Sequence, residues 1–329
     1  MKGRVFSGMR PTGRMHMGNY MGAVQNWAAL QQDYECIYCI VDIHALTTLT
    51  PQEARELQPL IRDMALDLLS AGIDPQRSIL FVQSYVPEVT ELNTLLSMVT
   101  PLGWLLRVPT FKEKVRQMQE TEASVNYGLV GYPILQTADI ILYKADSVPV
   151  GEDQLPHLEL AREIVRRFNH LFGPTFPEPQ AKLTPAPLIL GTDGQQKMSK
   201  SLNNHIELAL TPDETRKRVM TMVTDPQRKR RNDPGNPEIC NVWKQHHYFN
   251  SDRVDTVARD CRSAALGCVD CKGLLADGIN RYFAQFRERR AELARHPATI
   301  DGTLADGARR ARAIAIQTMA EVRQRMGLR

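Results

Sequence analysis

The chain has 329 residues, of which 43% are hydrophobic and 24% charged, a composition typical of a globular protein with one large and one smaller domain. Its net charge of +4 permits a nucleic-acid partner without requiring one. No apolar run approaches the roughly 20 residues of a membrane helix, and the N-terminal residues lack the apolar core of a signal peptide. We therefore expect a cytoplasmic protein and no membrane partner.

The first elements are predicted to be a strand, a turn and a helix. Residues 4–8 are β-prone, residues 10–13 favour a turn, and apolar side chains have helical spacing over residues 21–32. This order opens many parallel α/β nucleotide folds, which place the ligand at the start of the helix. His16 follows the turn and is a candidate ligand contact, although a single histidine in a turn is more often structural.

Alternating strands and helices continue through the first half of the chain. Strands are predicted over residues 36–43, 78–83 and 148–150, and helices over residues 51–71 and 86–107. Another helix is expected after residue 154, and residues 174–187 are rich in proline and are predicted to be irregular. The pattern predicts an α/β protein with a doubly wound parallel sheet.

Polar residues lie at the predicted ends of these strands. His44 follows the strand predicted over residues 36–43, and residues 151–154 (Gly-Glu-Asp-Gln) follow the strand predicted over residues 148–150. Open α/β sheets bind ligands at this edge. Residues 129–143 are apolar except for Gln136 and Asp139, and a carboxylate among so many apolar neighbours needs a donor from the protein or from a ligand. The alternative is an aspartate that caps a helix or forms a salt bridge.

A loop with two lysines follows at residues 197–201, Lys-Met-Ser-Lys-Ser. Two lysines three residues apart suit a polyphosphate, which lysine binds as a point charge. Taken alone, so short a motif is more often a solvated loop.

Four cysteines in the second half of the chain are separated by twenty, six and two residues: Cys240, Cys261, Cys268 and Cys271. In a reducing compartment such grouping indicates metal or cluster ligation rather than disulfides. Basic residues are concentrated at positions 216–218 and 228–231, a pattern typical of a solvated face or of a surface that contacts phosphates.

In combination these signals resemble the class I aminoacyl-tRNA synthetases, and within them the tryptophanyl-tRNA synthetase family. Pro11-Thr12-Gly13 with His16-Met17-Gly18-Asn19 is similar to the HIGH signature of that class, and residues 197–201 are an unsubstituted KMSKS. Residues 148–169, with His157, Arg162 and Phe168-Asn169, are similar to a block of the tryptophan enzyme. The resemblance extends from Arg4 to Leu328.

The resemblance implies ligation of L-tryptophan to tRNA(Trp) through a tryptophanyl-adenylate, with ATP as substrate, Mg2+ and a homodimer. It implies catalytic roles for Lys197, Ser199 and Lys200. It implies ATP contacts from Met9, Arg10, Thr12, His16, Gly18, Asn19, Gly151, Asp153, Lys197, Met198, Ser199, Lys200 and Ser201. It implies tryptophan contacts from Phe6, Gly8, His44, Tyr132, Gln136, Asp139, Val148, Val150 and Gln154, with Asp139 accepting the indole N–H. Arg10 and Gln136 depart from the well-studied bacterial pattern, which has Gln and Met there.

For the cysteines the resemblance implies a 4Fe–4S cluster, because a subset of the family carries one on a similar motif with a slightly longer first gap; Zn2+ is the alternative. We expect three domains or segments. Residues 1–207 would form a Rossmann-like catalytic domain with a dimer-forming insertion. Residues 208–295 would form a helical anticodon-binding domain, and residues 296–329 a helix that packs back on the catalytic domain. The rival interpretations are a tyrosyl-tRNA synthetase and a synthetase-like RNA-binding protein without catalysis.

Overall fold

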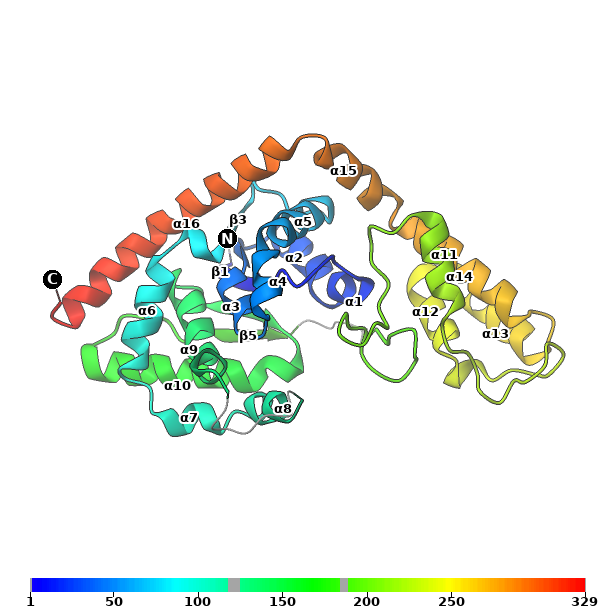
Figure 1. Ribbon diagram of the computed structural model, residues 1–329, viewed down its shortest axis with the longest axis horizontal. Helices are drawn as coiled ribbons and strands as arrows, with labels where there is room; N and C mark the ends of the chain where they lie inside the picture. The colour runs from blue at the N-terminus through cyan, green and yellow to red at the C-terminus, as the bar shows by residue number, and fades with distance from the viewer. Residues whose placement is uncertain (1, 118–124, 184–188, 329) are drawn as a thin grey trace. The chain divides into compact units, whose positions relative to one another are not determined.

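A five-stranded parallel sheet forms the centre of the larger part of the chain (Figure 1). The structure is a computed structural model that describes residues 2–117, 125–183 and 189–328. The strand order is β3-β2-β1-β4-β5, with bounds β1 Arg4–Met9, β2 Glu35–Ile40, β3 Ser78–Val82, β4 Ser147–Val150 and β5 Gln180–Leu183. The order reverses between β1 and β4, the switch point beside which such sheets bind ligands. The predicted α/β fold is confirmed.

Helices account for most of the remaining structure. In chain order they are α1 Met17–Asn19, α2 Gln25–Leu30, α3 Asp42–Leu46, α4 Pro51–Arg55, α5 Leu57–Ser70, α6 Glu88–Ser97, α7 Leu102–Leu106, α8 Pro109–Gln117, α9 Tyr127–Leu142, α10 Leu155–Phe172, α11 Pro212–Met220, α12 Asn241–Phe249, α13 Val254–Arg262, α14 Cys268–Tyr282, α15 Ala284–Ala294 and α16 Pro297–Arg325. Short 3-10 turns lie at Gln83–Tyr85, Glu152–Gln154, Pro237–Ile239 and Ser251–Arg253.

The two faces of the sheet are covered by different helices because side chains alternate along each strand. Cys39 of β2 faces the core that also holds residues of α9, α10 and α16. Its neighbour Tyr38 points the other way and stacks on Trp27 of α2 at 4.9 Å between ring centroids. Cys36 and Cys39 are each 1% exposed, which confirms that they are core thiols.

Four predicted elements differ from the structure. The helix expected over residues 86–107 is interrupted after Ser97, and a second helix, α7, begins at Leu102. The helix expected over residues 51–71 is divided at Glu56 into α4 and α5. The strand expected over residues 36–43 ends at Ile40, and Asp42 already begins α3. The irregular segment expected over residues 174–187 contains the edge strand β5, whose side chains are mostly exposed and therefore give no apolar signal.

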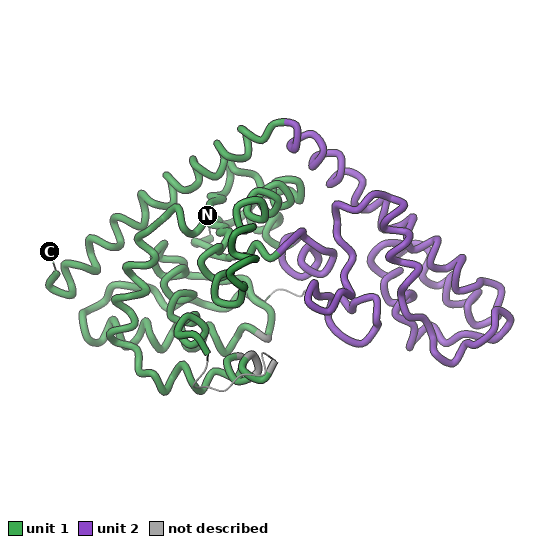
Figure 2. The backbone as a smooth tube through the Cα atoms, viewed as in Figure 1, with its two compact units in different colours: residues 1–12, 26–185, 296–329 green, residues 13–25, 186–295 purple. Residues whose placement is uncertain are grey.

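The chain divides into two compact units (Figure 2). Unit 1 comprises Met1–Thr12, Asn26–Pro185 and His296–Arg329, and unit 2 comprises Gly13–Gln25 and Ala186–Arg295. Unit 1 holds the sheet, with α16 packed along β3. Unit 2 holds the second, helical part that the sequence predicts, in which α14 packs against α11 and α12. The described residues contain no helix long and apolar enough to cross a membrane.

Candidate active site

The two-lysine loop of unit 2 extends over residues 190–204 and begins as a narrow hairpin. Leu190 pairs with Lys197 in an antiparallel bridge, and the Gly191 N–H donates to the Gln196 carbonyl at 2.8 Å. Met198 is 2% exposed and anchors the loop in the interior, whereas the Lys197 side chain is exposed. The hairpin therefore holds its backbone in place while it leaves a lysine free to reach a ligand.

The turn that contains His16 is hydrogen-bonded to the segment that leaves this loop. The Met17 N–H donates to the Ile206 carbonyl at 2.9 Å, and the Leu208 N–H donates to the Met15 carbonyl at 3.0 Å. Lys200 Nζ donates to the Gly13 carbonyl at 2.6 Å. The structure thus brings the two motifs together within unit 2, although nearly 200 residues of sequence separate them (Figure 2).

His16 is buried and neutral at physiological pH. Burial, followed by the charges of Lys200, His205 and Lys197, lowers its pKa to about 3. Its Nδ1 accepts the Asn19 backbone N–H at 3.3 Å, so the remaining proton lies on Nε2. A neutral imidazole with Nε2–H is a hydrogen-bond donor that suits a phosphate oxygen.

Gly18 is a glycine because of its neighbours. A Cβ on it would lie 3.1 Å from the His16 ring and 3.2 Å from Met198 Cβ. The Gly18 backbone therefore lies closer to the His16 ring and to Met198 than a residue with a side chain would allow. With Asn19, these residues form the unit 2 part of the predicted ATP site.

In unit 1, the predicted indole acceptor Asp139 lies in a buried hydrogen-bond network. Its side chain is on α9 and is 2% exposed. His44 Nε2 lies 2.9 Å from Oδ2, and Gln83 Nε2 donates to Oδ1 and Oδ2 at 2.9 and 2.8 Å. Burial raises the pKa of Asp139, and the hydrogen bond and charge of His44, followed by the Gln83 hydrogen bond, oppose that rise. The network fixes the carboxylate in one orientation.

His44 is a predicted tryptophan contact, and in the structure its ring nitrogen is directed to Asp139. Gln83 was not predicted at all. Its Oε1 accepts the Ile43 and His44 backbone N–H groups at 3.1 and 3.3 Å, so both ends of its amide are used. A polar residue that directly follows a buried strand was the signal that could have identified it.

A second chain of hydrogen bonds joins the predicted substrate residues Tyr132 and Gln154. The Tyr132 hydroxyl lies 2.6 Å from His157 Nε2, and His157 Nδ1 lies 3.0 Å from Gln154 Oε1. His157 is 5% exposed and links the two side chains. It belongs to the sequence block that carried the resemblance, but it was not among the predicted contacts.

Apart from Gln136, the other predicted unit 1 residues lie on or after β1 and β4, the strands beside the switch point. Phe6 stacks on Tyr143 with centroids 5.6 Å apart, and Val148 and Val150 are buried. Gln136 lies on α9 and is half-buried. The remaining positions are Gly8 and Met9 in β1, Arg10 and Thr12 directly after it, Gly151 after β4, and Asp153 in the 3-10 turn Glu152–Gln154.

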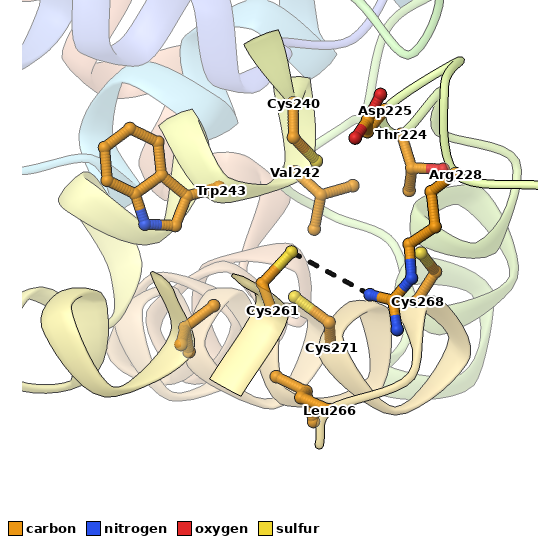
Figure 3. A pocket seen from close by; sticks show the side chains of 11 residues that line it. Thr224, Asp225, Arg228, Cys240, Val242, Trp243, Cys261, Leu266, Cys268 and Cys271 are labelled. Atoms are coloured by element: carbon orange, nitrogen blue, oxygen red, sulfur yellow. Dashed lines mark hydrogen bonds between the residues drawn. The ribbon is translucent and has the colours of Figure 1, made fainter. Parts of the chain in front are cut away.

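The four cysteines line one pocket of unit 2 (Figure 3). Cys240 directly precedes α12, Cys261 lies in α13, and Cys268 and Cys271 lie in the first turn of α14. Burial and the other three thiols raise the pKa of Cys271 to about 12, against a smaller opposite effect of Arg228. Thiols that repel one another as thiolates provide the negative charge that a cation or cluster needs.

In the described structure these thiols are not gathered around a single metal ion. Four sulfurs around a zinc ion at 2.3 Å would lie about 3.8 Å from each other. Among the described residues, no group of three His, Cys, Asp or Glu side chains is placed to hold a metal ion. Four thiols are a donor set that suits a structural zinc ion or an iron–sulfur centre in its chemistry.

Comparisons with known proteins match this architecture along nearly the whole chain. Residues 1–284 match the family described as tRNA synthetases class I (W and Y). A tryptophan–tRNA ligase of Thermotoga maritima is 45% identical, with 99% of each chain covered, and one of Aquifex aeolicus is 41% identical, with 99% of this chain and 100% of the relative covered.

A solved structure gives the same result. A tryptophanyl-tRNA synthetase from Campylobacter jejuni, complexed with ADP and tryptophan, superposes with a TM-score of 0.89 at 34% identity, covering 99% of this chain and 100% of that one. The resemblance that the two motifs indicated is therefore present over the full length. The chain belongs to the tryptophanyl-tRNA synthetase family of class I tRNA synthetases.

Proposed function

We propose that this chain is a tryptophan–tRNA ligase, which activates L-tryptophan with ATP and passes it from the adenylate to the 3′ end of tRNA(Trp). The observation that carries the proposal is its full-length similarity to tryptophan–tRNA ligases, with the KMSKS sequence unaltered. Exchange of labelled pyrophosphate into ATP, measured with tryptophan and with tyrosine, tests it. Tryptophan alone should support exchange; tyrosine-dependent exchange would indicate the tyrosyl enzyme, and no exchange would indicate a non-catalytic protein.

Activation requires alignment and charge neutralisation more than covalent help from the protein. The tryptophan carboxylate is already ionised at neutral pH, so no general base is needed for its attack on the α-phosphorus. Lys197, Ser199 and Lys200 would stabilise the departing pyrophosphate, and bound Mg2+ would share that charge. Neutral His16 would donate from Nε2 without adding a fixed charge.

Selection of tryptophan would depend on the buried acceptor Asp139. The indole N–H is a donor only, and a site built around such a donor rejects analogues that leave its carboxylate unpaired. The unused lone pairs of the oriented carboxylate supply that acceptor. Phe6, Gly8, Val148 and Val150 would line the aromatic slot, and Tyr132, Gln136 and Gln154 would hold the polar end.

We also propose that the four cysteines hold a 4Fe–4S cluster. Such a cluster, when bound, ties together the helices that supply its thiolates. Arg228 supports an anionic site, since one of its guanidinium nitrogens lies 3.8 Å from Cys261 Sγ (Figure 3). Anaerobically isolated protein should be brown with four irons per chain; colourless protein with one zinc per chain would refute the cluster.

The remaining partners follow from the surface. The exposed basic residues Lys229, Arg230 and Arg231 suit the phosphates of tRNA. In the proposed domain organisation, residues 1–207 form the catalytic domain, residues 208–295 bind the anticodon, and residues 296–329 pack on the catalytic domain. Exposed Met98 and Leu102, 71% and 60% accessible, support a homodimer through unit 1. None of the six cysteines forms a disulfide, which suits a reducing cytoplasm.

A further inference from the structure

The end of the two-lysine loop is held by one buried asparagine. Asn204 is 3% exposed, although it follows three exposed residues. Its Oδ1 accepts the Ser199 backbone N–H at 2.7 Å. Its Nδ2 donates to Asp193 Oδ2 at 2.7 Å, with a longer contact of 3.4 Å to the Lys197 carbonyl. The Asn204 side chain, at the end of the loop, thus contacts Asp193 near its start and Lys197 and Ser199 in its middle.

Asp193 is the charged partner in this arrangement. Its Oδ1 accepts the Gln195 and Gln196 backbone N–H groups at 3.0 and 3.2 Å. Burial alone would raise the pKa of Asp193, but the hydrogen bonds from Asn204 and from these two N–H groups lower it below the ordinary value. The carboxylate therefore stays ionised and orders the turn that leads into Lys197.

The space for Asn204 is made by Gly191 at the base of the loop. A Cβ on Gly191 would lie 2.2 Å from the Asn204 amide group. The Thr192 N–H donates to the Asn204 carbonyl at 2.8 Å, which closes the base. From the other side, Asn241 Nδ2 donates to the Gly191 carbonyl at 2.8 Å. The base is therefore fixed on both sides by buried amides within unit 2.

We propose that Asn204 is a positioning residue for amino-acid activation, which sets the places of Ser199 and Lys197 through its bonds to Asp193 and the loop backbone. The proposal rests on the proposed role of this loop in binding ATP. Asn204 would not touch ATP itself. It would keep the loop in the conformation from which the lysines and the Ser199 backbone reach the triphosphate.

An exchange of the two side chains tests the proposal. In N204D a carboxylate faces the Asp193 carboxylate, and the donor to it is lost. In the double variant D193N/N204D, the new carboxylate at position 204 accepts the Ser199 N–H and the new amide N–H at position 193. The oxygen of that amide keeps the two turn N–H groups. The matched control is N203D, which adds the same charge one residue away at an exposed position beside Arg218.

Pyrophosphate exchange and thermal unfolding are measured for the full-length chain and all variants. For N204D we expect kcat/KM for ATP to fall about 10- to 100-fold, the size of one lost hydrogen bond to a charged group. The KM for tryptophan should change less than twofold, because the predicted tryptophan residues lie in unit 1. N203D should match the wild type, and the double variant should recover most of the loss.

Each other outcome has a definite meaning. Wild-type ATP kinetics in N204D would overturn the proposal, and so would a double variant no better than N204D. Equal losses in the KM values for ATP and tryptophan would make Asn204 a residue of general stability and also overturn it. Absence of exchange in the wild-type chain would instead refute the proposed function of the loop.

Discussion

Gln83 offers a sharp test of how the tryptophan acceptor is held. It is 1% exposed, and its amide donates to both oxygens of Asp139 while it accepts two backbone N–H groups at the start of α3. Gln83→Met keeps the length and shape of the side chain and removes all of these hydrogen bonds. We expect Asp139 to lose its orientation and part of its charge stabilisation.

The magnitude follows from the contacts. Hydrogen bonds to a charged group contribute about 1.5 to 3 kcal/mol, and the orphaned N–H groups add to the loss, so unfolding should become easier by about 4 kcal/mol. If orientation of the acceptor accounts for about 2 kcal/mol of transition-state binding, kcat/KM for tryptophan should fall about 30-fold. The KM for ATP should stay unchanged.

The decrease of kcat/KM for tryptophan at low pH gives a second test of the role of Gln83. If Asp139 accepts the indole N–H as proposed, tryptophan recognition needs its carboxylate, so recognition is present above the pKa of that group and is lost as the pH falls through it. Burial places this pKa above the ordinary value, and Gln83 opposes the rise. Gln83→Met should therefore move the acid limb of kcat/KM for tryptophan to higher pH.

Gln31→Met is the matched control for this variant. Gln31 is also a buried glutamine of unit 1, and its amide bonds the Ala28 and Gly72 carbonyls and the Asp74 N–H. It should lose similar stability while its tryptophan kinetics stay normal. If both variants lose the same stability and neither changes kcat/KM for tryptophan or its pH profile, the assigned role of Gln83 is wrong.

Three further outcomes are expected. Lys200→Ala should slow adenylate formation about 100-fold in single-turnover assays, a loss typical of one removed charge-stabilising group. Tryptophan affinity should stay nearly unchanged. Equal losses in adenylate formation and tryptophan affinity would mean that the lysine mainly stabilises the fold. Asp139→Asn should weaken discrimination against phenylalanine and tyrosine in pyrophosphate exchange, and unchanged selectivity would exclude it as the indole acceptor. Affinity for tRNA should fall steeply with salt, and Arg230→Gln should reduce the slope of log K against log salt by about one, whereas an unchanged slope would place Arg230 outside the tRNA contact.

Local patterns in the sequence were sufficient for most of the architecture. The apolar runs of β2 and β3 and the helical patterns of α5 and α10 predicted a parallel α/β sheet, because burial on both faces leaves a continuous apolar run. β5 escaped prediction because an edge strand with exposed side chains has neither that run nor clear alternation. The division at Glu56 escaped it because α4 buries no side chain, so no apolar spacing marks where α4 ends and α5 begins.

The candidate site was predictable where a motif is continuous and not where contacts join distant segments. The two lysines and the CxxC pair are visible in a few residues of sequence. Asn204 and Gln83 act through tertiary hydrogen bonds to Asp193 and Asp139, which nothing in their local sequence specifies. His44 shows the same limit, since its place after β2 suggested a ligand contact, whereas its observed partner, Asp139, lies on α9 and could not be read from the local sequence.

The most direct test of the central claim is charging of tRNA(Trp) with labelled tryptophan by the purified full-length chain. The account predicts ATP-dependent formation of tryptophanyl-tRNA, none with tyrosine, and a loss of about two orders of magnitude in the Lys200→Ala variant. Charging with tyrosine, or no charging by a chain that binds tRNA(Trp), would contradict it.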